Sequence, residues 1–471
     1  MKILYIGAGY VGTCSAAVSA DSGHQVLAYD ILEKKVKMLG SGDRAQIEEC
    51  LLEEGLAEML IRNKERVKFT SDYGEVEKFL NEADAVFMCL PTPERAGAAG
   101  ETDLTYYNQA AEKLAEHLTK RNAGAQDHYV VIVNKSTVPI NMVEETDRMM
   151  KKYEVENYGV VSNPEFLVEG KAMEGSIHPA RVVVGAQSET DFSIMRQIYQ
   201  RFYDSSSVRY LEVSPREAAA GKLLANYLLF NRLGITFDVV GRVCESFSGV
   251  QFENVRNILI TDERIGKWGF YDSIFAGGSC LIKDAASLAH QLEEVGTSAR
   301  YVRQTLESNL FQRDNFYGRA AKEAEFSWRD KSVAVLGVAF KQDTNDVRNS
   351  PALDLVGQLL NDGVKEARVY DPAASPMFKS LFDPSRDERF KKIIYVKSEQ
   401  EALAGSDVCL ILTDWPQFKS LTELIMETCP PPFLIMDGRR MLAHRFEELS
   451  QKGYNIIAVG SPFIKGKKEY V

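Results

Sequence analysis

Residues 2–12 read Lys-Ile-Leu-Tyr-Ile-Gly-Ala-Gly-Tyr-Val-Gly, an apolar run that leads directly into three spaced glycines. The apolar residues predict a short buried strand, and the alanine-rich stretch 14–22 predicts a helix. In such a turn the first glycine permits a tight bend, the second lets the backbone approach a pyrophosphate, and the third permits close helix packing. A strand, this turn and a helix predict an α/β fold of the dinucleotide-binding type.

The second expected strand ends in an acid. Residues 24–30 read His-Gln-Val-Leu-Ala-Tyr-Asp, which places Asp30 where a carboxylate accepts a hydrogen bond from a ribose 2′-hydroxyl. The same carboxylate repels a 2′-phosphate, so the sequence favours NAD over NADP. The alternative is a tight turn in a Rossmann-like protein that binds no ligand.

Strand and helix patterns divide the chain into three parts. Apolar runs alternate with amphipathic stretches up to residue 162, which indicates a parallel sheet with crossover helices. A long helix pattern then runs from Pro215 to about Gln251, and a charged, helix-prone segment covers 292–327. The expected strands are 3–6, 25–29, 85–90, 130–134 and 159–162 in the first part, and 331–337, 367–370, 408–412 and 433–436 in the last. We expect two Rossmann-like doubly wound domains, 1–205 and 329–471, joined by a central helical region, 206–328.

Composition excludes several classes of protein. The 471 residues are 45% hydrophobic and 26% charged, as in an ordinary globular protein, and the net charge of -11 argues against nucleic acid as a partner. The N-terminus does not resemble a signal peptide, and no apolar stretch approaches the length of a membrane span. The seven cysteines are scattered, which indicates reduced thiols in a cytoplasmic protein. The six histidines lie far apart in the sequence and indicate no metal site.

A cysteine follows a pair of glycines at 277–284, which read Gly-Gly-Ser-Cys-Leu-Ile-Lys-Asp. If a helix begins here, Cys280 and Asp284 lie on one face of it, and the helix N-terminus favours the nucleophilic thiolate. The alternative is a buried structural cysteine beside a surface charge.

Three further segments carry polar groups to the same region of an α/β fold. Residues 135–139 (Lys-Ser-Thr-Val-Pro) and 163–170 (Asn-Pro-Glu-Phe-Leu-Val-Glu-Gly) each follow an expected strand. The Asn-Pro pair predicts an extended turn that holds Glu165 in one direction. Lys222 and Asn226 lie one turn apart on the long helix, among leucines. They are candidate oxyanion donors, or simply the solvated side of that helix.

Taken together, these blocks resemble the UDP-glucose/GDP-mannose dehydrogenase family, and its UDP-glucose 6-dehydrogenase branch most. The resemblance covers nearly the whole chain in family order. The matching blocks are 7–12, 136–139, 163–167, Lys222 with Asn226, 277–280 with Lys283 and Asp284, and Ala339-Phe340-Lys341 with Asp346-Val347-Arg348. The family implies an NAD-binding domain, a helical dimerisation region that carries the cysteine, and a C-terminal nucleotide-sugar domain.

The resemblance also implies a four-electron oxidation of a sugar C6 alcohol to a carboxylate, with two NAD and a cysteine-linked intermediate. Cys280 is then the nucleophile, Lys222 and Asn226 stabilise the oxyanion, and Asp284 assists proton removal. Glu165, with Thr137 placing water, completes thioester hydrolysis. The choice of base among Lys222, Asp284 and Glu165 stays open.

Binding residues follow from the same resemblance. The expected cofactor-binding residues are Gly7, Gly9, Tyr10, Val11, Gly12, Asp30, Lys35, Pro91, Thr92, Ser136, Thr137, Glu169, Lys283 and Arg348. The expected substrate-binding residues are Glu165, Phe166, Leu167, Lys222, Asn226, Arg264, Ser273, Gly277, Phe340, Lys341, Arg439 and Arg440. Guanidinium groups suit bidentate phosphate contacts. The arginine that Arg264 resembles reaches the substrate, in some family members from a neighbouring subunit.

The chain departs from the family text around the cysteine. Where the common family text before Ser-Cys is Gly-Phe-Gly-Gly, this chain reads Ile274-Phe275-Ala276-Gly277-Gly278. Leu281-Ile282 stands in place of Phe-Pro or Leu-Pro, Ile140-Asn141 in place of Val-Gly after 136–139, and Asn349 where glutamate is common. The candidate catalytic residues match the family, whereas the residues expected to line the substrate pocket differ from it. We therefore expect UDP-glucose oxidised to UDP-glucuronate, with a UDP-N-acetylhexosamine, GDP-mannose or TDP-glucose as alternative substrates.

Two other functions remain open from the sequence. One is a single-step nucleotide-sugar or hydroxy-acid dehydrogenase in which Cys280 is structural. The other is a non-catalytic nucleotide-sugar-binding protein, against which the joint presence of the six candidate catalytic residues argues.

Overall fold

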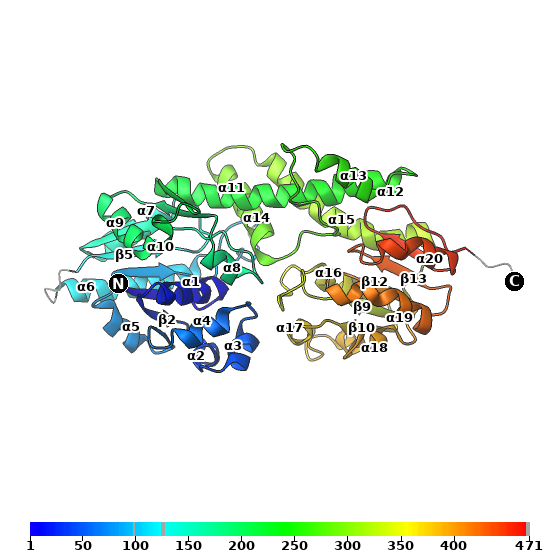
Figure 1. The fold of residues 1–471 in the computed structure, drawn as a ribbon, viewed down its shortest axis with the longest axis horizontal. Helices are drawn as coiled ribbons and strands as arrows, with labels where there is room; N and C mark the ends of the chain where they lie inside the picture. Colours follow the sequence, from blue (N-terminus) through cyan, green and yellow to red (C-terminus); the bar gives the residue numbers. More distant parts are fainter. Residues whose placement is uncertain (98, 124–127, 468–471) are drawn as a thin grey trace. The chain divides into compact units, whose positions relative to one another are not determined.

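The computed structural model describes residues 1–97, 99–123 and 128–467 (Figure 1). The described chain forms two compact units. The first comprises Met1–Ala225 and Ser287–Thr297, and the second comprises Asn226–Ala286 and Ser298–Val471. The central region expected at 206–328 is divided between these units, and the last four residues of the expected third domain lie outside the described part. The three-domain division stays a prediction.

The first unit is built on an eight-stranded sheet in the order β3-β2-β1-β4-β5-β6-β7-β8. All neighbouring strands are parallel except β6 and β7. The strands are β1 (Lys2–Ile6), β2 (Gln25–Tyr29), β3 (Val67–Thr70), β4 (Ala85–Met88), β5 (Val130–Asn134), β6 (Tyr158–Ser162), β7 (Arg181–Gly185) and β8 (Arg209–Val213). The first six follow the strand order of a dinucleotide-binding sheet, with its switch point between β1 and β4.

Helices cover both faces of this sheet. Those on one face pack with Ile3 and Tyr5 of β1, and those on the other with Leu4 and Ile6. The first set is α1 (Tyr10–Asp21), α2 (Glu33–Leu39), α3 (Arg44–Cys50), α4 (Leu56–Arg62), α8 (Ala172–Ile177), α9 (Glu189–Ile198) and α10 (Gln200–Tyr203). The second set is α5 (Tyr73–Leu80), α6 (Thr105–Ala123) and α7 (Met142–Lys152). Alternate residues of β1 therefore serve two separate cores.

The long helix expected from Pro215 ends at Ser246 rather than near Gln251. It comprises α11 (Pro215–Gly234), a π-helical stretch (Ile235–Val240) and α12 (Gly241–Ser246). α13 (Phe252–Leu259), α14 (Ser279–Glu294) and α15 (Arg300–Ala324) follow it. Among the described residues, 215–246 is the one helix long and apolar enough to cross a membrane, by length and composition alone, a test that core helices of soluble proteins also pass. The expected absence of a membrane span stays a prediction.

The second unit contains a parallel six-stranded sheet in the order β11-β10-β9-β12-β13-β14. The strands are β9 (Ser332–Leu336), β10 (Glu366–Tyr370), β11 (Ile393–Tyr395), β12 (Val408–Ile411), β13 (Leu434–Asp437) and β14 (Asn455–Ala458). Its helices are α16 (Pro351–Asn361), α17 (Ser375–Leu381), α18 (Glu399–Leu403), α19 (Leu421–Thr428) and α20 (Phe446–Gln451). The order repeats that of the first unit, so the prediction of two Rossmann-like doubly wound sheets with a central helical region is confirmed.

Candidate functional site

The glycine turn at the N-terminus has the geometry that a dinucleotide requires. Gly7 adopts φ +101°, and a Cβ on Gly12 would lie 2.0 Å from the carbonyl oxygen of Gly7. At Gly9, in contrast, a Cβ would meet no heavy atom within 4 Å. Because α1 begins at Tyr10, the open space at Gly9 lies at a helix N-terminus, where backbone N–H groups favour an anion.

Asp30 lies beside this turn at the end of β2. Its Oδ2 accepts hydrogen bonds from the backbone N–H of Ala8 at 3.0 Å and from Nζ of Lys35 at 3.1 Å. The carboxylate is therefore held next to the glycines, with its second oxygen bonded to the N–H of Leu32. These residues fit NAD: the turn suits the pyrophosphate, and Asp30 suits the adenine-side ribose hydroxyls.

The loops after β4 and β5 are tied to each other. Thr92 donates from Oγ1 to the carbonyl of Thr137 at 2.8 Å, and Ser136 donates from Oγ to the carbonyl of Leu90 at 2.7 Å. Four expected residues, Pro91, Thr92, Ser136 and Thr137, thus come together beside the switch point of the sheet.

Glu165 and Lys222 form a buried ion pair within the first unit. Nζ of Lys222 lies 3.1 Å from Oε1 of Glu165, and the backbone N–H of Leu167 donates to Oε2. Lys222 is only 4% exposed, whereas Leu228 on the same long helix is 63% exposed. The interpretation of Lys222 and Asn226 as the solvated side of this helix is wrong, because both side chains are buried while several leucines are exposed.

Asn226 and Asp284 form a second buried pair, within the second unit. Nδ2 of Asn226 donates to Oδ2 of Asp284 at 2.5 Å, and Nζ of Lys283 donates to Oδ1 at 2.5 Å. Both Asn226 and Asp284 are less than a tenth exposed. Each oxygen of Asp284 therefore has a donor, which compensates for the burial of this polar group.

Cys280 lies in the first turn of α14, which begins at Ser279. The sequence expectation of a helix start is confirmed, so Cys280 and Asp284 are one turn apart on one helix. Its sulfur lies 3.8 Å from Oγ of Ser279, and the residue is partly exposed. Cys14 and Cys409 are buried instead, and burial raises the pKa of both of these thiols well above the ordinary value.

The loop before Cys280 packs on a segment of the C-terminal sheet. A Cβ on Gly278, which has φ +86°, would lie 2.9 Å from the ring of Phe340, and a Cβ on Gly277 would lie 2.7 Å from the carbonyl oxygen of Asn349. Arg439 donates from Nη2 to the carbonyl of Phe340 at 2.7 Å. The structure thus brings together Gly277, Phe340 and Arg439, three residues expected to bind substrate.

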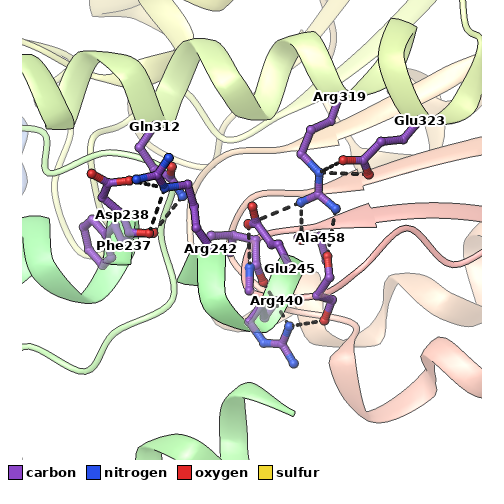
Figure 2. Close-up of polar contacts among 12 residues, drawn as sticks. Phe237, Asp238, Arg242, Glu245, Gln312, Arg319, Glu323, Arg440 and Ala458 are labelled. Atoms are coloured by element: carbon purple, nitrogen blue, oxygen red, sulfur yellow. Dashed lines mark hydrogen bonds and ion pairs between the residues drawn. The ribbon is translucent and has the colours of Figure 1, made fainter. Parts of the chain in front are cut away.

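The other expected arginines already hold carboxylates of the chain. Arg440 pairs with Glu253 at 2.5 Å and donates to the carbonyl of Val459, beside the buried Arg319–Glu245 pair (Figure 2). Arg348 pairs with Asp346 at 2.6 Å, and the highly exposed Arg264 pairs with Asp262 at 2.7 Å. Contact of these three with a cofactor or substrate stays a prediction.

Comparison with known proteins shows the family. The models of the UDP-glucose/GDP-mannose dehydrogenase family match residues 1–203 with the NAD binding domain, 216–310 with the central domain and 334–444 with the UDP binding domain. The chain belongs to this family.

Individual relatives agree. The chain is 31% identical to UDP-glucose 6-dehydrogenase TuaD of Bacillus subtilis, over 99% of this chain and 94% of the relative. It is 30% identical to the UDP-glucose 6-dehydrogenase of Pseudomonas aeruginosa, over 98% of each. A solved UDP-glucose dehydrogenase from Pyrobaculum islandicum superposes with a TM-score of 0.84 at 27% identity, over 98% of both chains. The chain is therefore an NAD-dependent nucleotide-sugar 6-dehydrogenase, an oxidoreductase.

Two residues of this dehydrogenase were not singled out from its sequence. Asn309 of α15 accepts from the N–H of Ala276 at 2.8 Å and donates to its carbonyl at 3.2 Å, and so holds the loop before Cys280. Lys135 is 8% exposed and donates to Asn163, just before Glu165. No signal marks Asn309, since it lies in a charged helix pattern, whereas Lys135 adjoins a matching family block.

Proposed function

We propose that this dehydrogenase oxidises UDP-glucose to UDP-glucuronate in two steps through a covalent adduct on Cys280. The observation that carries the proposal is the buried Asn226–Asp284 pair, one helical turn after a cysteine at a helix N-terminus. A thiol beside a fixed carboxylate and a fixed amide donor suits the oxidation of an alcohol beyond the aldehyde.

In the first oxidation the C6 hydroxyl loses a proton and a hydride. NAD, held by the glycine turn and Asp30, supplies the hydride acceptor. Asp284, directly or through a water, takes the proton, and Asn226 and Lys222 donate to the developing oxyanion. The side chains of Lys222 and Asn226 are both buried. Hydrogen-bond donors in a place of low dielectric constant stabilise charge more strongly than donors in bulk water.

In the second oxidation the Cys280 thiolate adds to the aldehyde carbon, and the carbonyl oxygen takes up a proton. The resulting thiohemiacetal then loses the hydrogen of C6 as hydride, for which a second NAD would be the acceptor, and its hydroxyl proton to the base, which leaves a thioester. Water then replaces sulfur at C6, which yields the carboxylate and returns the thiol. Glu165 activates this water, with Thr137 placing it. Two NADH form for each sugar.

The choice of UDP-glucose rests on relatives. Both bacterial relatives above carry the name UDP-glucose 6-dehydrogenase and align with nearly the whole chain. A solved UDP-D-ManNAc dehydrogenase from Pyrococcus horikoshii, at 23% identity and a TM-score of 0.75, supports the fold alone. The altered residues around Cys280 keep UDP-N-acetylhexosamines, GDP-mannose and TDP-glucose as the alternative substrates.

The test is the yield of NADH per sugar. Purified protein is incubated with NAD and with UDP-glucose, UDP-N-acetylglucosamine, GDP-mannose or TDP-glucose. The NADH formed is measured, and the sugar products are identified by mass spectrometry. Two NADH and UDP-glucuronate support the proposal. One NADH with an aldehyde product indicates a single-step dehydrogenase. A higher kcat/KM with another nucleotide sugar assigns that sugar as the substrate in place of UDP-glucose. No NADH with any of the sugars indicates a non-catalytic binding protein.

We further propose that the chain works as a homodimer in the cytoplasm, with the central helical region at 206–328 as the dimer interface. Leu228, Ile235, Val239 and Val243 of the long helix are each more than 40% exposed. A second copy that packs on this face would remove these side chains from water. The cytoplasmic location is supported by the cysteines, all described and none in a disulfide.

A further inference from the structure

A cavity of about 280 Å³ lies inside the first unit, behind the segment that carries Glu165. Its walls come from α1, from residues 163–167 after β6, from the beginning of β7 and from Tyr199 and Phe202. At about 30 Å³ for each water, this volume corresponds to roughly nine water molecules, enough for a small organic or inorganic ion but not for a nucleotide.

Among the residues assigned to the two known ligands of the family, only those of one short segment line the cavity. Neither the glycine turn, Asp30, Thr137 nor Lys222 contributes to its wall. Three substrate candidates, Glu165, Phe166 and Leu167, form part of the wall, so one short segment borders both the candidate substrate site and this cavity.

The charged groups of the wall are mainly cationic. Lys135 and Arg181 stand against one carboxylate, Glu165, which is already paired with Lys222 outside the wall. This positive balance is unusual within a chain whose net charge is -11. The wall therefore attracts an anion rather than a cation.

Lys135 has an ammonium N–H to spare. It donates to Oδ1 of Asn163 at 3.0 Å and to the hydroxyl of Tyr199 at 3.2 Å, and no third acceptor lies within reach among the described residues. An ammonium carries three donors and this side chain is more than nine-tenths buried, so its third N–H is available to an acceptor in the cavity. Burial lowers the pKa of Lys135 to about 8, against opposing effects of Cys89 and Glu165, which is the response of an incompletely compensated cation.

Arg181 is the second cation without a counter-ion. Its guanidinium stacks on the ring of Phe166, 3.8 Å from the centroid, and no carboxylate of the described residues lies within ion-pair distance. A guanidinium that stacks on a ring still presents its N–H groups at its edge, where they suit the oxygens of a carboxylate or phosphate.

We propose that this cavity is a binding site for a small oxyanion, of the phosphate or dicarboxylate type, held by Lys135 and Arg181. The anion completes the hydrogen bonds of Lys135 and neutralises both cations. Because Asn163 and Glu165 belong to one short turn, the anion also stiffens the segment that positions Glu165. This effect on turnover rests on the proposed function, whereas the binding itself does not.

Calorimetry on the full chain tests the binding. The protein is first saturated with NADH and UDP, so that phosphate subsites for those ligands are occupied, and is then titrated with inorganic phosphate or with malonate. We expect one anion to bind per chain. Whichever of phosphate and malonate binds with the lower Kd identifies the type of ligand. Arg181→Gln should weaken binding about ten-fold or more, as expected for loss of a charge-assisted hydrogen bond.

Two further variants separate the cavity from general charge effects. Arg209 of β8 lies opposite Arg181 of β7 in the sheet but does not line the cavity. Arg209→Gln should therefore leave the Kd for the anion unchanged. Ser15→Leu fills part of the cavity without a change of charge and should weaken binding as much as Arg181→Gln does. The proposal is overturned if neither anion saturates at millimolar concentrations, or if Arg209→Gln and Arg181→Gln have equal effects. Binding without any NADH production would leave the site standing and remove only the proposed function.

Discussion

Asn226 donates a hydrogen bond to Asp284 over 2.5 Å, although 58 positions separate them in the chain. The other oxygen of the same carboxylate accepts a hydrogen bond from Nζ of Lys283. An acid held by two donors in a buried place keeps a fixed direction, which a proton acceptor in catalysis needs.

Replacement of this acid should abolish turnover with little loss of binding. For Asp284→Asn we expect kcat to fall about 10²–10⁴-fold, the range for loss of a general base, with KM for the sugar within a few-fold of wild type. Steady-state NADH formation measures both. Asp314→Asn, a change on the exposed side of α15, is the matched control. Unaltered kcat in Asp284→Asn would remove Asp284 from the chemistry.

The thiol of Cys280 should be required for the second oxidation. Cys280→Ser keeps the shape but offers a poor nucleophile at neutral pH, so we expect four-electron turnover to fall at least about 10³-fold. Mass spectrometry of quenched reactions should find a protein–sugar adduct in the wild type at Cys280. Cys50→Ser, at a partly exposed cysteine of α3, should behave like wild type. A Cys280→Ser enzyme with full production of uronic acid would contradict the covalent route.

Asp30 should set the choice of cofactor. Replacement by asparagine weakens the acceptor for the ribose hydroxyls and removes the repulsion of a 2′-phosphate, and it leaves Lys35 available to that phosphate. For Asp30→Asn we expect the ratio of kcat/KM for NAD over NADP to fall about ten-fold or more, equivalent to one lost charged hydrogen bond. Glu33→Gln, at the exposed start of α2, is the control. An unchanged ratio would mean that another group discriminates between the cofactors.

The pH dependence of stability should report Asp272. Burial raises its pKa to about 6, although Arg440 and Arg256 act against the shift. Its ordinary value is about 3.9, so between about pH 4 and 6 the unfolded chain loses a proton that the folded chain keeps. Stability therefore falls as pH rises through this window, by at most about 3 kcal/mol, and the cost persists above it. Thermal melts of Asp272→Asn should show a smaller fall across pH 4–6 than wild type. A parallel fall in both proteins would assign the effect to other groups.

Asn309 should position the loop before Cys280 without contact with substrate. Asn309→Ala leaves the buried N–H and carbonyl of Ala276 without partners, which costs about 1–3 kcal/mol of stability. Because this loop contacts Phe340, we also expect KM for the nucleotide sugar to rise more than kcat falls. Urea unfolding and steady-state kinetics measure the two effects. Asn309→Asp, which keeps the acceptor for Ala276 N–H, should recover part of the stability.

Local patterns in the sequence predicted those parts of the fold that depend on neighbouring residues. The glycine turn, the place of Asp30 and the helix start at Cys280 follow from strand, turn and helix preferences over a few residues, and the structure confirms each. Nine expected strands are also present. β3, β7, β8, β11 and β14 were not predicted; among them, Val67–Thr70 is short and carries a lysine, and Arg209–Val213 is largely exposed, so neither of these two has a clear apolar pattern.

Contacts between distant residues could not be predicted in the same way. The long helix contains leucines on several sides, so its sequence does not reveal that Lys222 and Asn226 point inward while Leu228 faces solvent. Their burial depends on Glu165 and Asp284, which come from other elements. The same holds for the pairing of Arg440 with Glu253, which a list of candidate phosphate ligands could not foresee.

The sequence by itself therefore determined the class of fold, the dinucleotide turn and the candidate residues for the chemistry, because each is written in a few consecutive positions. Only the tertiary structure decided which polar groups are buried in pairs, that Asn309 holds the loop before Cys280, and that Lys135 and Arg181 border one cavity. These relationships join residues 30 or more positions apart, and their stability comes from the desolvation and pairing of groups that meet only when the chain is folded.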